Sequence, residues 1–314
     1  MKICFTHKPI NTSFGGGNQF VLNMIKFIKN KDVSIQIVFD LNHRDIDIIF
    51  VLDPRILSCN KINYNMVSQY KTYFPNVKII HRVNDCDKPR GNYNVLDPII
   101  MRNFKINDLT IFVSKWTYEY YKKKGFDGNY KIINNGCDVS YFFPKKYIFD
   151  KKNINIFTHH WSDNWNKGFE YYNAIVEYIK NKKNIKFTFI GRKYNNKEGI
   201  PNNINIIGPY NGIKLGNLLR ENDIYLTGSK FDNCPMHVIE GLSCGLPMLY
   251  HEDIGGGEEI CENNGEKFSD INTMIEKLNK IIDNYDTYLD IDYKKLSSDT
   301  CCKKYYNEFI NLLT

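Results

Sequence analysis

The chain has 314 residues, of which 42% are hydrophobic and 25% are charged, and 42 basic against 35 acidic side chains give a net charge of +7. This length suits two ordinary domains, and the composition excludes disordered and fibrous proteins. The positive charge is spread along the chain, so it predicts no nucleic-acid partner and fits small acidic ligands or an anionic membrane surface better.

The cysteines and the apolar runs bear on the compartment. Nine cysteines include no C-x-x-C pair, so the pattern indicates neither a zinc site nor a disulfide framework. Reduced thiols predict a cytoplasmic protein. The longest apolar runs, such as residues 48–52, fall far short of the roughly 20 residues that span a bilayer, and the first residues resemble a strand more than a signal peptide.

The first half of the chain alternates between strand-like and helix-like segments. Strands are predicted at 2–7, 34–40, 46–52, 77–83, 109–114 and 131–136. Apolar side chains at helical spacing follow the first of them, which predicts a doubly wound α/β domain. A basic, proline-marked stretch comes next, and we place the boundary there, giving an N-terminal domain over 1–147 and a C-terminal domain over 148–314.

The alternation then restarts. Strands are predicted at 154–160, 185–192, 204–210, 224–229 and 246–251, with helices near 167–183, near 215–220 and from Pro235. This predicts a second α/β domain of similar size. A last helix is predicted over 299–314, and it is a candidate to pack back on the N-terminal domain. Its predicted apolar side carries Tyr305, Tyr306, Phe309, Ile310 and Leu313.

Three loops that lead from a strand into a helix are candidate anion sites, because free N–H groups and the helix dipole favour negative charge there. The first is FGGGNQF at 14–20, where Gly15, Gly16 and Gly17 let a ligand approach the backbone closely. Phe20 stands where a dinucleotide fingerprint needs its third glycine, which argues against an NAD-dependent oxidoreductase.

The second loop is HHWSDNWNKG, in which Lys167 lies at the mouth of a helix. Its ammonium group is suited to a phosphate. The alternative is a solvated lysine, with the histidines and tryptophans of this loop packing the domain edge. His159 and His160 are poor joint metal ligands, because successive strand residues point to opposite faces.

The third loop opens DNCPMHVIEGLSCGLP at 232–247. Pro235 suits the first turn of a short helix that Gly245 ends. The apolar arc of this helix consists of Val238, Ile239 and Leu242. Glu240 lies roughly 100° or more from that arc and is therefore predicted to point away from the core. Asp232, before the helix, is either a cap or a ligand group, and the glycine loop at 255–257 is predicted to shape the same crevice.

These pieces together resemble the retaining, nucleotide-sugar-dependent glycosyltransferases of family 4, which have the two-domain GT-B architecture. The most specific element is an acidic residue, seven intervening residues and a glutamate, which here are Asp232 and Glu240, followed by a small-residue helix and G-x-P. GGGNQF, NKG, FIGR and GGGEEI occur in the expected order. The resemblance covers nearly the whole chain and implies two Rossmann-like domains facing across a cleft.

The resemblance implies a hexosyltransferase that moves a sugar from a UDP- or GDP-linked donor to a glycan, lipid-linked or protein-linked hydroxyl acceptor, without a metal or other cofactor. Lys167 would hold the diphosphate, Glu240 would bind the ribose, and Asp232 would meet the donor sugar, with Asp232 and Lys167 as the catalytic residues. The implied donor-binding set is Gly15, Gly16, Gly17, Lys167, Arg192, Asp232, Asn233, Cys234, Pro235, Met236, Ile239 and Glu240.

Two departures from the family pattern leave alternatives open. The first acidic position is commonly glutamate and is Asp232 here, while the arginine usually found before the lysine-glycine pair is not evident, so Arg192 is a candidate to replace it. A sugar-nucleotide epimerase or hydrolase of the same fold, or an inactive sugar-nucleotide-binding module, therefore stays an alternative.

A further alternative concerns the segment 114–126, which carries Trp116, Tyr120 and three consecutive lysines. It is either a solvated basic helix packed on the core or a peripheral contact with an anionic membrane.

Overall fold

The computed structural model describes residues 1–10, 16–55, 62–144, 149–191, 205–207 and 210–314. The chain divides into two compact units, one formed by Met1–Asn135 with Ser298–Thr314 and the other by Gly136–Ser297. We call them unit 1 and unit 2. The predicted boundary at residue 147 lies outside the described residues. The predicted second domain, 148–314, also included the segment Ser298–Thr314, which belongs to unit 1.

Unit 1 contains a parallel sheet with the strand order β2-β1-β3-β4-β5-β6. The strands are β1 Lys2–Phe5, β2 Gln36–Val38, β3 Ile48–Val51, β4 Lys78–Val83, β5 Leu109–Phe112 and β6 Tyr130–Ile132. The helices are α1 Gly16–Lys31, α2 Tyr64–Tyr73, α3 Asp97–Phe104, α4 Lys115–Lys122 and α10 Ser298–Asn311. The predicted doubly wound α/β domain is confirmed.

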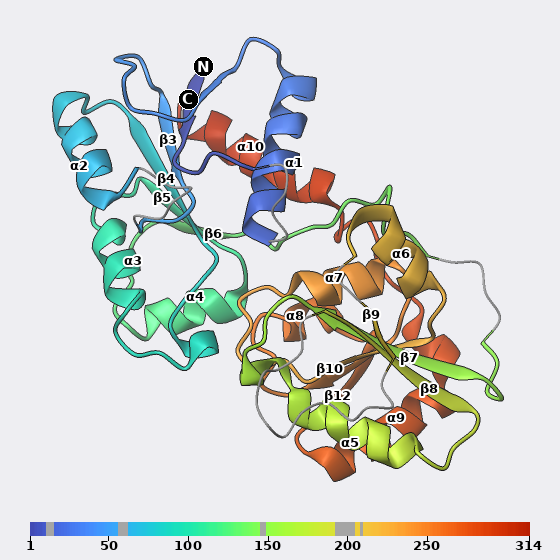
Figure 1. Cartoon of the computed structure of the whole chain (residues 1–314). Helices are drawn as coiled ribbons and strands as arrows, with labels where there is room; N and C mark the ends of the chain where they lie inside the picture. The colour runs from blue at the N-terminus through green and yellow to red at the C-terminus, as the bar shows by residue number, and fades with distance from the viewer. Residues whose placement is uncertain (11–15, 56–61, 145–148, 192–204, 208–209) are drawn as a thin grey trace. The chain divides into compact units, whose positions relative to one another are not determined.

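The C-terminal helix α10 packs beside α1 in unit 1 (Figure 1). Tyr305 and Phe309 are fully buried, and their rings lie 4.9 Å from Phe20 and 5.1 Å from Phe50. The predicted apolar side of this helix was too wide. Ile310 and Leu313 are exposed, because Ile310 lies about 100° around the helix from Phe309 and Leu313 lies beyond the last residue of α10.

The segment at α4 packs its aromatic side chains within unit 1. The rings of Trp116 and Tyr120 stack 5.7 Å apart, and both belong to the margin of a buried cluster. Lys124 pairs with Asp97 at 3.1 Å. A membrane contact of this segment stays a prediction. Within the described part of the chain, no helix has the length and apolar character to cross a bilayer.

Unit 2 contains a second parallel sheet with the order β12-β11-β10-β7-β8-β9. The strands are β7 Ile154–His160, β8 Ile185–Gly191, β9 Asn205–Ile207, β10 Ile224–Thr227, β11 Met248–His251 and β12 Gly265–Phe268. The helices are α5 Phe169–Ile179, α6 Gly212–Arg220, α7 Met236–Ser243, α8 Glu258–Cys261 and α9 Ile271–Asp283. Two parallel-sheet α/β domains thus confirm the predicted fold class.

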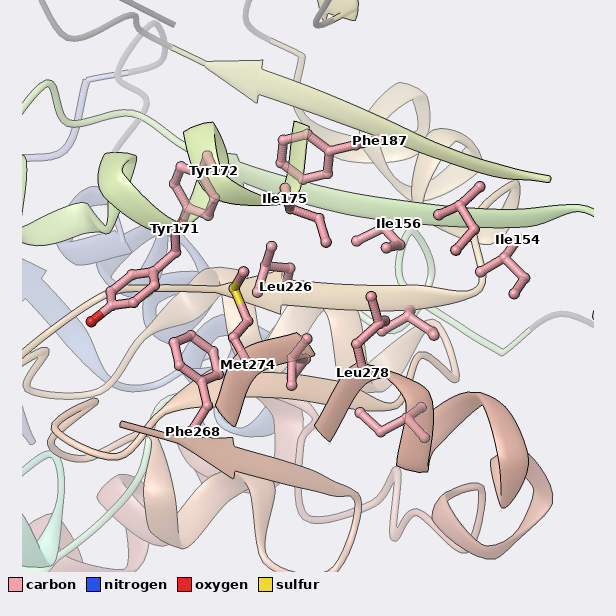
Figure 2. Close-up of a cluster of buried hydrophobic side chains, with 14 of the residues drawn as sticks. Ile154, Ile156, Tyr171, Tyr172, Ile175, Phe187, Leu226, Phe268, Met274 and Leu278 are labelled. Atoms are coloured by element: carbon pink, nitrogen blue, oxygen red, sulfur yellow. The ribbon is translucent and has the colours of Figure 1, made fainter. Parts of the chain in front are cut away.

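A buried cluster joins the sheet of unit 2 to α5 and α9 (Figure 2). Ile156 and Leu226 come from neighbouring strands and point to the face of the sheet that α5 and α9 both cover, where they meet Ile175 of α5 and Met274 and Leu278 of α9. Full burial of each such side chain contributes about 1.5–3 kcal/mol relative to exposure. The cluster fixes the strands whose ends carry the candidate site.

Candidate functional site

The strand order of unit 2 creates a switch point between β7 and β10. From β7 the chain continues through β8 to β9 on one side, and then crosses to β10, β11 and β12 on the other. In such sheets a crevice opens at the carboxyl ends of the two central strands, and ligands bind there. The second and third sequence motifs follow β7 and β10 respectively, so the sheet brings both to this point.

Two glycines hold the segments after β7 and β10 together. Gly168 has φ +88° and follows a single 3₁₀ turn, Trp165–Lys167. A Cβ atom on Gly168 would lie 2.3 Å from the Cα atom of Gly228, so glycine is required both for the backbone conformation and for the close approach. The N–H of Lys230 also donates to the carbonyl oxygen of Asn166 at 2.8 Å. The two loops are therefore fixed against each other.

Lys167 and Asp232 form an ion pair across these loops. The Nζ atom of Lys167 lies 2.6 Å from Oδ2 of Asp232, and the side chains are 24% and 19% exposed. The two residues that the sequence singled out for the donor diphosphate and the donor sugar thus lie together. The pair also shows that an anionic oxygen fits against the ammonium group of Lys167.

The glycine loop at 255–257 holds the main chain of Asp232. The N–H of Asp232 donates to Ile254 at 3.0 Å, and its carbonyl oxygen accepts from the N–H of Gly256 at 2.8 Å. Gly255 has φ +78°, and a Cβ atom there would lie 2.5 Å from that carbonyl oxygen. Phe231, just before Asp232, has φ +59°, a conformation that costs energy for a residue with a side chain. Asp232 therefore sits on a tightly constrained backbone.

The helix α7 follows this loop as predicted, with a small difference at its start. Pro235 occupies the position that precedes the first helical residue, and Gly245 has φ +84° just beyond the end. Val238, Ile239 and Leu242 are fully buried, which confirms the predicted apolar arc. The side chain of Ile239 therefore offers no surface to a ligand. Asn233, Cys234 and Pro235 are buried in the loop, and Met236 is half-buried.

Glu240 lies off the apolar arc and contacts the end of β7. Its Oε2 atom lies 2.8 Å from Nε2 of His159, and its side chain is 18% exposed. His159 is itself buried, and the hydroxyl group of Tyr225 lies 3.0 Å from its Nδ1 atom. The sequence assigned His159 only to packing at the domain edge, and it missed this contact because the two residues lie far apart in the chain.

Two further buried histidines lie near Lys167. Burial lowers the pKa of His160 and of His237 well below the ordinary value, and the positive charge of Lys167 lowers both pKa values further. The Nδ1 atom of His160 donates to the carbonyl oxygen of Ser162 at 2.8 Å, and Nε2 of His237 lies 3.1 Å from Oγ1 of Thr227. Both imidazoles are neutral at pH 7, so neither of them adds positive charge beside Lys167.

Of the remaining predicted residues, two belong to unit 1 and two lie outside the described residues. Gly16 is the first residue of α1 in unit 1, and Gly17 follows it, so these glycines belong to the helix start and not to a loop. Gly15 and Arg192 lie outside the described residues. Within the described ranges, no group of three or more histidine, cysteine and acidic side chains is placed to hold a metal ion.

Unit 1 has a pocket of its own at the carboxyl ends of β3 and β4, which the sequence did not single out. Asp53, Arg55, His81 and Asp85 are among its lining residues. Arg55 pairs with Asp53 at 2.5 Å and with Asp85 at 3.7 Å. Burial raises the pKa of Asp85 above its ordinary value, and the neighbouring arginines offset part of this rise. The only signal in the sequence was the run of polar residues directly after two predicted strands.

Comparisons with known proteins agree with this architecture. Residues 141–296 match the family described as glycosyl transferases group 1. No curated protein sequence matches the chain. Sucrose-phosphate synthase from Thermosynechococcus elongatus is similar in structure, with a TM-score of 0.70 and 11% identity over 99% of this chain and 98% of that one.

Two other solved structures show the same likeness. The lipopolysaccharide outer core galactosyltransferase WaaB has a TM-score of 0.69 and 13% identity over 99% of both chains. Anabaena HepE, in complex with UDP and glucose, has a TM-score of 0.65 and 11% identity over 100% of this chain and 97% of that one. The chain thus has the GT-B fold of two Rossmann-like domains, and its residues 141–296 match the glycosyl transferases of group 1.

Proposed function

We propose that this protein is a glycosyltransferase that moves a hexose from a nucleoside-diphosphate sugar, UDP- or GDP-linked, to a hydroxyl acceptor with retention of configuration. The observation that carries the proposal is the meeting of Lys167 and Asp232 at the switch point of unit 2, with Glu240 on the adjoining helix. The match of residues 141–296 to group 1 glycosyl transferases supports it, as does the fold shared with a structure that contains UDP and glucose.

The chemistry of these groups suits departure of a nucleoside diphosphate. As the bond to the sugar breaks, negative charge grows on the diphosphate, and the ammonium group of Lys167 stabilises that charge. The N-terminal end of α7, directly after the Asp232 loop, adds a favourable dipole. In this proposal these groups replace a metal ion, Asp232 contacts the donor sugar, and Glu240 accepts a hydrogen bond from the ribose.

The acceptor is assigned to unit 1. Asp53 and Asp85 line its pocket beside Arg55, and carboxylates are strong acceptors for the hydroxyl groups of a sugar. We propose a glycan, lipid-linked or protein-linked acceptor. These oxygens lie on loops after parallel strands, where binding residues are commonly placed.

The test is an assay of the purified protein with a panel of UDP- and GDP-sugars and a mixture of glycan acceptors, with and without EDTA. Release of nucleoside diphosphate together with a glycosylated acceptor, unchanged by EDTA, is expected. A free epimer or free sugar without an acceptor product would support the alternative enzymes, and binding without turnover would indicate an inactive module.

A matched pair of lysine variants assigns the activity to the site. Lys167→Ala should weaken binding of the nucleoside diphosphate and reduce transfer. Lys186→Ala removes an exposed lysine on the neighbouring strand β8 and should change neither. Equal activity of both variants would show that Lys167 does not bind the diphosphate.

A further inference from the structure

Three side chains from three elements form a chain of hydrogen bonds beneath the proposed ribose site. Tyr225 comes from β10, His159 from β7 and Glu240 from α7. The hydroxyl group of Tyr225 lies 3.0 Å from Nδ1 of His159, whose Nε2 lies 2.8 Å from Oε2 of Glu240. Tyr225 and His159 are almost completely buried, and Glu240 is 18% exposed. The chain therefore runs from the core to the surface of the site.

Contacts at both of its ring nitrogens hold the side chain of His159. An ionised carboxylate only accepts, so Nε2 of His159 carries the proton that it donates to Glu240. The hydroxyl group of Tyr225 lies 3.0 Å from Nδ1 and 3.1 Å from the main-chain oxygen of His159, and its oxygen accepts the main-chain N–H of His159 at 3.0 Å. Contacts at both ring nitrogens thus hold the imidazole in one orientation.

The two oxygens of Glu240 are in different situations. Oε2 accepts from His159, whereas Oε1 accepts no hydrogen bond from any residue in the described part of the chain. Because Oε2 is bound on the inner side, the carboxylate cannot rotate freely. Oε1 is left as an oriented acceptor at the carboxyl edge of the sheet, where α/β folds bind nucleotides.

We propose that His159 is a positioning residue that orients Glu240 so that Oε1 accepts a hydrogen bond from a ribose hydroxyl of the nucleotide. The inference rests on the proposed function of Glu240. It has a consequence for specificity, because a carboxylate held for a hydroxyl group is left without its partner when the ligand lacks that group. The site should therefore prefer ribonucleoside diphosphates over their 2′-deoxy or 3′-deoxy analogues.

The experiment measures the affinities of UDP, GDP and their 2′-deoxy and 3′-deoxy analogues by calorimetry. His159→Leu removes the donor to Glu240 at similar volume and should weaken ribonucleotide binding roughly 3- to 10-fold, as expected for one hydrogen bond to a charged group that becomes disordered. The ratio of the affinities for the ribonucleotide and for its deoxy analogues should fall toward 1. His159→Gln restores an N–H donor near the Nε2 position and should recover most of the affinity and most of this preference.

A double-mutant cycle shows whether His159 acts through Glu240. Glu240→Ala alone should abolish the preference for ribose. His159→Leu should then cause no further loss of ribonucleotide affinity in the Glu240→Ala background. Additive losses, or an unchanged ribose preference in His159→Leu, would overturn the positioning role.

Two controls keep the outcome interpretable. Binding of inorganic pyrophosphate depends on Lys167 in this proposal, so it should be unchanged in His159→Leu, which reports that the site is still folded. Tyr225→Phe removes the hydroxyl that fixes the imidazole and should lower the ribose preference in the same direction.

The cycle also separates this inference from the proposed function. If Glu240→Ala weakens ribonucleotides and His159→Leu does not, the positioning role is wrong while the donor site stands. If Glu240→Ala itself leaves ribonucleotide affinity unchanged, the ribose assignment and the positioning role both fail.

Discussion

The ammonium group of Lys167 and the carboxylate of Asp232 lie 2.6 Å apart, although 65 positions separate them in the chain. The pair joins the loop after β7 to the loop after β10. A bound diphosphate must share Lys167 with Asp232 or replace it as the partner. Asp232 is therefore both the residue proposed to meet the sugar and a competitor for the cation that binds phosphate.

Replacing Asp232 with asparagine should separate these two roles. The amide keeps the shape and removes the competing charge, so the affinity for UDP or GDP should rise, by up to about fivefold for a pair that is worth roughly 0.2–1 kcal/mol at the surface. Sugar transfer should fall in the same variant. Calorimetry and the transfer assay measure the two effects.

The control for this variant is Asp253→Asn, which removes a nearby exposed charge that forms no ion pair with Lys167 in the structure. It should leave nucleotide affinity unchanged. Weaker binding of the nucleoside diphosphate by Asp232→Asn would contradict the competition.

Gly168→Ala should destabilise unit 2 and displace Lys167. The new Cβ atom would lie 2.3 Å from the Cα atom of Gly228, and φ of +88° is unfavourable for alanine. Together these effects should lower the free energy of unfolding by about 2–4 kcal/mol. Urea denaturation followed by tryptophan fluorescence measures the change.

Gly212→Ala is the matched control in the same unit, because Gly212 also has positive φ while its nearest neighbour to an added Cβ would lie 3.8 Å away. It should cost only the backbone contribution of about 1 kcal/mol. Equal losses in the two variants would show that the contact with Gly228 contributes nothing.

Gly255→Ala should reduce sugar transfer more than nucleotide binding. An added Cβ atom would lie 2.5 Å from the carbonyl oxygen of Asp232, so the loop that carries this carboxylate has to shift. Because Asp232 is proposed to meet the sugar and to compete with the diphosphate for Lys167, while Glu240 meets the ribose, the affinity for free UDP should not fall. Transfer at its wild-type rate by a folded variant would mean that the glycine loop does not control the position of Asp232.

The elements that could be predicted are those whose pattern is local. Parallel strands buried on both faces give continuous apolar runs, as in LTIF of β5. The arc of α7 was visible for a similar reason. Helices α2, α3 and α9 and the strand β12 were not predicted. The pattern of α9 is also local, because Met274, Leu278 and Ile281 recur at helical spacing, and it was overlooked, whereas β12 is a short edge strand with one buried side chain.

The candidate site divides in the same way. The spacing of Asp232 and Glu240 lies within one motif, so it was visible in the sequence. The contacts Lys167–Asp232 and His159–Glu240 join residues 65 and 81 positions apart. They depend on β7 lying next to β10, and no local pattern states which strands are neighbours. The sequence therefore named the proposed ligand-binding groups but not their partners.

The buried histidines of unit 2 should make its stability depend on pH. Burial lowers the pKa of His160, His237 and His251 in the folded protein, and lysine charges lower them further. In the unfolded chain these side chains bind protons at the ordinary pKa of 6.5. Below that pH the unfolded state binds more protons than the folded state, so stability is fully present above about pH 6.5 and is lost as the pH falls.

Each histidine that stays neutral in the folded state should cost about 1.4 kcal/mol per pH unit below 6.5. Urea denaturation between pH 7.5 and 5.5 in a Trp116→Phe variant measures this in unit 2, because the remaining tryptophans, Trp161 and Trp165, lie there. His237→Asn should reduce the pH dependence by the contribution of one proton, whereas His43→Asn, at a partly exposed position of unit 1, should not. Stability that stays constant over this range would show that the folded state accepts these protons and that burial does not hold the imidazoles neutral.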